Sequence, residues 1–124
     1  SYGKATSAGV NASSGSEYID IVGSSFVFVK IMVKVGYSGN ATYQMHVLYD
    51  YVTSNYYTTG STATRTDILQ VEAANAQFNY SDFVISRPAN RTVRLTYTPT
   101  SGSGTHAPIY YVSGIFNTLT LTTA

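Results

Sequence analysis

Apolar residues recur at every second position along residues 25–35. In a β-strand, alternate side chains share one face of the sheet. The odd-numbered positions of this run are all β-branched, which suits a buried strand face. They predict the core face of a long strand and comprise Val27, Val29, Ile31, Val33 and Val35.

The even-numbered positions of the same run form a second, mixed face. Phe26, Phe28 and Met32 make it apolar, and Lys30 and Lys34 add charge. A strand that is apolar on both faces needs cover on both. That cover is either a second sheet or a second copy of the chain, and we expect Phe26, Phe28 and Met32 to lie at a subunit interface.

Further period-two segments and turn residues continue to the end of the chain. Ser and Thr together supply 32 of the 124 residues and Val supplies 12, which favours pleated sheets with hydroxyl-rich outer faces. We expect strands over 18–22, 25–35, 41–54, 56–59, 66–71, 78–85, 91–98 and 109–121, the last interrupted at Gly114. The predicted fold is an all-β, antiparallel β-sandwich or jelly roll of about seven to eight strands.

The first sixteen residues differ in composition from the rest. They contain five Ser, three Gly and three Ala, with no repeating apolar position. We expect residues 1–16 to be a flexible leader or a junction to an upstream region, and residues 17–124 to form the β-sandwich domain.

Charge and apolar run lengths bear on the partners. The net charge of +1 gives no field strong enough to attract a polyanion, so no nucleic-acid partner is expected. The apolar runs are far shorter than the ~20 residues of a membrane-spanning helix, so no membrane insertion is expected. The chain has no cysteine and therefore no thiolate zinc site and no cysteine nucleophile.

The carboxylates offer no obvious catalytic pair. A glycosidase needs two acids facing each other across a cleft, and the sequence favours no pair among Glu17, Asp20, Asp50, Asp67, Glu72 and Asp82. No nucleophilic-serine elbow or phosphate-binding loop is found either. We predict a non-enzymatic protein with no catalytic residue and no cofactor, and keep a glycosidase as a minor hypothesis.

Two features involve histidine and arginine. His46 and Asp50 lie two pleats apart on one strand face, which fits a charge-paired histidine or, with three copies around an axis, a weak metal site. A hydrogen-bonded surface or interface histidine is the favoured interpretation, and no metal is predicted. The four arginines, all within residues 65–94, could bind an anionic sugar, but ion pairs with acids nearby in sequence are favoured.

Tyrosine is the unusual residue of this chain, with twelve copies. Tyrosine combined with serine and glycine is typical of binding surfaces, because the ring supplies contact area at low entropic cost. Simple filling of sheet faces and of a subunit interface is an equally good explanation, and both can hold. The predicted ligand-binding residues are two adjacent tyrosine pairs and a histidine in the loop over 99–108, namely Tyr56, Tyr57, His106, Tyr110 and Tyr111.

The overall style of the chain resembles a known class of proteins. A low-complexity lead-in, a cysteine-free domain rich in Thr, Val and Tyr, and the closing residues 115–124 (IFNTLTLTTA) resemble the C-terminal receptor-binding tip of a bacteriophage tail or head fibre. The resemblance implies a homotrimer at the fibre tip of the virion, or otherwise extracellular, that recognises polysaccharide or protein on the host surface. The alternative is a structural assembly or capsid-decorating domain whose tyrosines serve subunit packing.

Overall fold

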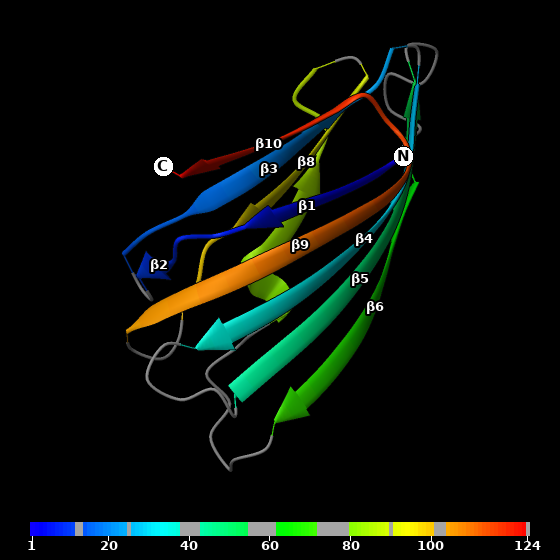
Figure 1. The fold of residues 1–124 in the computed structure, drawn as a ribbon. Coiled ribbons are helices and arrows are strands. Elements are labelled where there is room, and N and C mark those ends of the chain that lie inside the picture. The colour runs from blue at the N-terminus through cyan, green and yellow to red at the C-terminus, as the bar shows by residue number, and fades with distance from the viewer. Residues whose placement is uncertain are drawn as a thin grey trace.

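The chain is described by a computed structural model that covers residues 1–11, 14–24, 26–37, 43–54, 62–71, 80–89, 91–100 and 104–123. The side chains of Phe26, residues 36–71 and Tyr80 lie outside the described part. Two antiparallel sheets pack face to face (Figure 1), so the predicted all-β sandwich is confirmed.

The larger sheet is six-stranded and has the order β1–β9–β4–β5–β6, with β2 also pairing β9. Figure 1 shows these strands side by side as a twisted layer. Strand β4 lies at its centre between β9 and β5, and β1 lies at one edge. The bounds are Tyr2–Thr6 for β1, Val10–Asn11 for β2, Phe26–Tyr37 for β4, Tyr43–Ser54 for β5, Thr62–Val71 for β6 and Thr105–Ile115 for β9.

The smaller sheet is four-stranded and has the order β10–β3–β8–β7. A single 3₁₀ turn, Tyr80–Asp82, precedes β7. In Figure 1, β8 and β7 pass behind β1 and β9 of the larger sheet, and β3 and β10 are seen above β1. Its strands are β3 (Glu17–Val22), β7 (Phe83–Ser86), β8 (Thr92–Tyr97) and β10 (Thr118–Thr123).

The prediction of a core face on β4 is confirmed. All five odd-numbered residues from Val27 to Val35 are at most 1% exposed. They meet Ile19 and Ile21 of β3 and Val93 and Leu95 of β8 in one apolar cluster between the sheets. Burying this surface is the main favourable term for the sandwich.

The prediction of a flexible leader over residues 1–16 is wrong for residues 2–6 and 10–11. Residues 2–6 pair antiparallel with β9, from Tyr2 opposite Ser113 to Thr6 opposite Ile109. The inward positions hold only Gly3 and Ala5. These small residues fit where the layer beneath is close, and they leave no apolar periodicity for sequence reasoning to detect.

The predicted last strand is divided close to Gly114. β9 ends at Ile115 and β10 begins at Thr118. Gly114 has a φ of 131°, and a Cβ there would overlap the backbone carbonyl oxygen of Phe28 and lie 3.0 Å from Val29 Cα. Glycine is needed because β9 approaches the backbone of β4 closely at this point.

Candidate interaction surface

The outer face of the larger sheet carries most of the exposed apolar surface of the described residues. Five large apolar side chains are exposed in that part of the chain, and four of them lie here: Tyr2 at 66%, Phe28 and Ile115 at 54% each, and Met32 at 44%. The fifth, Val84, lies on β7 of the smaller sheet. Clustering of this kind marks an interaction surface, whereas scattered exposed apolar residues do not.

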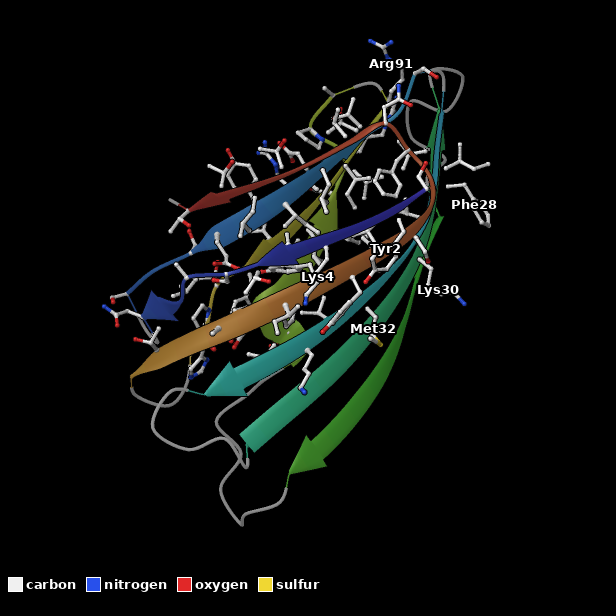
Figure 2. The ribbon with its side chains drawn as sticks, viewed as in Figure 1. Tyr2, Lys4, Phe28, Lys30, Met32 and Arg91 are labelled. Carbon is white, nitrogen blue, oxygen red and sulfur yellow. The ribbon has the colours of Figure 1, made fainter. Side chains whose placement is uncertain are left out.

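The same face holds every lysine of the chain. Lys4 and Lys30 are exposed and Lys34 is half-buried. Figure 2 shows Lys4 of β1 near Met32 of β4, Tyr2 of β1 on the neighbouring row with Lys30, and Phe28 farther along the same sheet. We call this surface the lysine face and define it by Tyr2, Lys4, Phe28, Lys30, Met32, Lys34, Tyr111 and Ile115.

Strand register explains how these side chains come together. Tyr111 of β9 pairs with Lys4 on one side and with Met32 on the other. The Lys4 ammonium lies 5.7 Å from the centroid of the Tyr111 ring, within range of a cation–π interaction. Lys30 lies opposite Asp50 of β5 in the ladder.

The outer face of the smaller sheet has a different chemistry. Its threonines alternate outward along β10 and β8, and its charges are paired. Arg94 donates two hydrogen bonds of 2.8 Å to Asp20, one to each carboxylate oxygen. The Arg94 guanidinium also lies 3.8 Å from the centroid of the Tyr18 ring. We call this surface the threonine face and define it by Tyr18, Asp20, Arg94, Thr96, Thr118 and Thr120.

The hydrogen bond with Asp20 raises the pKa of Arg94, with a further contribution from the nearby Asp20 charge. The arginine therefore stays charged at neutral pH. On this face, a bidentate ion pair satisfies both charges without an outside partner.

A buried polar cluster joins the two sheets. Glu17 of β3 has no exposed surface, and its carboxylate accepts hydrogen bonds of 2.5 Å from the hydroxyls of Ser7 and Tyr110. Ser7 in turn accepts a hydrogen bond from the backbone N–H of Gly9. Burial raises the pKa of Tyr110, and its interaction with Glu17 raises it further, so this phenol stays protonated and able to donate.

A second buried contact links β8 and β9. The Tyr97 hydroxyl lies 2.8 Å from His106 Nδ1, and both residues are fully buried. Burial lowers the pKa of His106, an effect that the charge of Asp82 partly opposes. Burial raises the pKa of Tyr97. This pair is therefore neutral at pH 7 and acts within the core.

The predicted ligand-binding set is largely not a surface site. His106 and Tyr110 are fully buried, so these two predictions are wrong for a ligand that approaches from solvent. His106 also lies in β9, because the ladder with β4 extends through residues 106–108 and shortens the expected loop. Tyr111 is half-buried on the lysine face, and Tyr56 and Tyr57 lie outside the described residues.

The predicted interface set is exposed where it is described. Phe28 and Met32 project outward from the centre of the larger sheet, as the even-numbered positions of β4 predict. The Phe26 side chain lies outside the described part, as do those of His46 and Asp50 and of the acids Asp67 and Glu72.

Sequence reasoning missed three members of the lysine face: Tyr2, Lys4 and Ile115. Tyr2 and Lys4 sit in a segment interpreted as a leader, although their two-residue spacing with Thr6 is the period of a strand. Ile115 follows the glycine taken as a strand break.

The described residues show neither a cluster of metal ligands nor a membrane-spanning helix. There, no group of three or more histidine or acidic side chains is arranged to hold a metal ion. No helix in that same part combines the length and hydropathy required to cross a membrane.

Comparisons with known proteins give one weak structural likeness. No protein-family model matches the chain, and no curated protein matches it. Among solved structures, the chain is similar to the tailspike protein of Acinetobacter phage vB_ApiP_P1, with a TM-score of 0.38 and 12% sequence identity. The match covers 99% of this chain and 22% of the tailspike chain, so this chain spans less than a quarter of that protein.

Proposed function

We propose that this chain is a non-enzymatic attachment domain of a phage tail or head fibre. In this proposal it assembles as a homotrimer at the tip of a virion fibre and binds polysaccharide or protein on the surface of the host cell. The observation that carries the proposal is the lysine face. This face exposes four large apolar side chains to solvent, which contact with a partner would bury. On the threonine face, Arg94 and Asp20 already pair with each other.

The central part of the lysine face is the proposed subunit contact. Phe28 and Met32 lie on β4, and Ile115 pairs with Phe28 across the ladder. β4 is flanked by β9 and β5, so its outer face is a broad surface rather than an edge. Covering these three side chains removes apolar surface from water, which stabilises the assembly by roughly 25 cal/mol for each Å² buried.

The described acids support a non-enzymatic role. Glu17 and Asp82 are buried and accept hydrogen bonds from Ser7, Tyr110 and Thr100. Asp20 is held by Arg94. In these positions the carboxylates stabilise the fold and do not face one another across a cleft, as the pair in a glycosidase does.

A mass measurement by light scattering tests the assembly. The expected mass is three times the chain mass of 13.4 kDa. The double substitution of Phe28→Ser with Met32→Ser should reduce it to that of one chain. Val84→Ser is the matched control, because Val84 is 57% exposed but lies on the other sheet. A wild-type protein that is monomeric at micromolar concentration would contradict the trimer.

A purely structural assembly domain would use the same apolar contact. Cell attachment separates the two functions. Fluorescently labelled protein should sediment with bacteria of a susceptible strain and be released by polysaccharide extracted from their surface. A trimer that attaches to no strain in a broad panel would favour the structural role.

A further inference from the structure

We propose that the edge of the lysine face, formed by β1 and β9, binds an acidic polysaccharide, that is, a glycan chain whose sugars carry carboxylate groups. The residues that would contact it are Tyr2, Lys4 and Tyr111. The inference rests on the attachment function proposed above and adds a site and a ligand class to it.

The strip lies beside the proposed subunit contact, since Tyr111 of β9 pairs with Met32 on one side and with Lys4 on the other. β1 is an edge strand of the larger sheet, whereas β4 is central. Tyr2 and Lys4 project from β1 on the outer face, and Figure 2 shows them apart from Phe28. A neighbouring subunit centred on β4 would adjoin Tyr111 and leave Tyr2 and Lys4, on the edge strand, open to a long ligand.

Charge favours an anionic occupant. Lys4 is exposed, and its described contact is the Tyr111 ring, with no described carboxylate within ion-pair distance. Lys34 lies one row of side chains away, since it pairs with Ile109, which also pairs with Thr6 of β1. Among the acids whose side chains are described, Glu17 and Asp82 are buried and Asp20 is paired with Arg94 on the threonine face. Asp50 of β5 is in register with Lys30, on the row next to that of Lys4 and with β4 and β9 between it and β1.

The surrounding groups favour a sugar over other anions. Tyr2 is 66% exposed, and its register partner Ser113 is also exposed. An aromatic ring beside hydroxyl groups matches the mixture of C–H and O–H groups on a sugar, while a lysine supplies the point charge for a carboxylate. A formal net charge of +1 is too weak to hold a densely charged nucleic acid.

Binding of the full chain to immobilised alginate, a polymer of uronic acids, tests the inference. Dextran serves as the neutral polysaccharide and poly-glutamate as an anion without sugars. Wild-type protein should bind alginate at least about tenfold more tightly than either of these polymers. An affinity difference of about tenfold is what one charged contact is expected to supply. Raising the salt from about 0.01 M to about 1 M shortens the screening length from about 30 Å to about 3 Å and should abolish the preference.

Matched variants locate the site. Lys4→Gln should weaken alginate binding about tenfold, and Lys4→Arg should retain most of it. Arg91→Gln removes the same charge from a side chain that precedes β8 of the smaller sheet and projects away from Lys4, so it should leave binding unchanged (Figure 2). Lys4→Gln should keep the mass of the wild-type assembly.

Each other outcome has a distinct meaning. Equal binding to alginate and dextran, or alginate binding that Lys4→Gln does not change, overturns the acidic-polysaccharide site. Loss of the assembly in Lys4→Gln assigns the strip to a second copy of the chain and also overturns it. The attachment function itself fails only if wild-type protein binds no bacterial surface, which the cell assay reports independently of alginate.

Discussion

The outer faces of the two sheets belong to the same sandwich but satisfy their side chains differently. On the threonine face, the Arg94 guanidinium donates two hydrogen bonds to Asp20 and lies over the Tyr18 ring, so these three groups contact one another. On the lysine face, Phe28 and Met32 remain exposed, and Lys4 meets an aromatic ring instead of a carboxylate. The first face pairs its described charges within a single chain, whereas the second exposes four large apolar side chains that the proposed assembly would cover.

The largest expected loss of stability comes from replacing Gly114, where β9 lies close to the backbone of β4 beneath the lysine face. Gly114→Ala would place a Cβ against the Phe28 carbonyl at a φ of 131°, where β9 crosses close to β4. We expect a loss of at least about 3 kcal/mol in the free energy of unfolding, measured by urea denaturation. The lysine face should lose its assembly as well.

Gly3→Ala is the control for that experiment. Its Cβ would lie 2.9 Å from the terminal Cδ2 of Leu119, which can rotate away. A cost below about 1 kcal/mol is expected. If both variants lose the same stability, close approach of β9 to β4 is not what Gly114 provides.

The second prediction compares neighbouring tyrosines that point to opposite sides of β9. Tyr110→Phe removes a donor from the buried carboxylate of Glu17 and should cost about 2–3 kcal/mol of unfolding free energy. Tyr111→Phe alters only the outer face and should cost less than about 0.5 kcal/mol. Equal costs would mean that the Glu17 contact contributes nothing beyond ring packing.

The third prediction tests whether the interior between the faces responds to acid. His106 is buried and neutral, and its pKa in the folded state lies below the ordinary value of 6.5. The unfolded state therefore binds more protons, and stability should fall as the pH drops below about 6.5. The loss should reach about 1.4 kcal/mol for each unit that separates the folded and unfolded pKa values.

Urea denaturation at pH 7.5 and 5.5 measures this effect, since most carboxylates are still ionised over that range. His106→Phe should flatten the dependence even if the variant is less stable at both values. A wild-type protein with equal stability at the two pH values would contradict a depressed histidine pKa.

Sequence patterns predicted the fold where side-chain alternation was strong. The segment Val27 to Val35 predicts a buried face because five β-branched residues recur with period two. Phe28 and Met32 were correctly expected on the opposite face. β1 was missed because its inward residues are only Gly3 and Ala5. Alternation could be recognised where the inward side chains are large, as in β4, and could not where little space is left for them, as in β1.

The site was harder to predict because it depends on which strands become neighbours. Arg94 and Asp20 are far apart in the chain, and pairing of β3 with β8 brings them together. The sequence favoured arginine partners nearby instead. Tyr110 and His106 looked suitable for ligand contact by residue type, but β9 directs both into the core, where Glu17 and Tyr97 occupy their polar atoms.

The smallest expected effects lie on the two surfaces themselves. Asp20→Asn breaks the bidentate pair with Arg94, but both groups are partly exposed, so a loss of only about 0.5–1 kcal/mol is expected. High salt should reduce this difference because exposed charges are screened. Unfolding in urea with and without added salt measures both quantities.

Phe28→Ser is the corresponding change on the lysine face, and its effect should depend on protein concentration. In a single chain Phe28 is 54% exposed, so its removal should cost less than about 1 kcal/mol. In an assembly the lost contact lowers stability further as concentration rises, because association stabilises only the folded state. Asp20→Asn should show the same cost at every concentration. A Phe28→Ser cost equally independent of concentration would remove the distinction between the two faces, since both would then be ordinary solvent-facing surfaces.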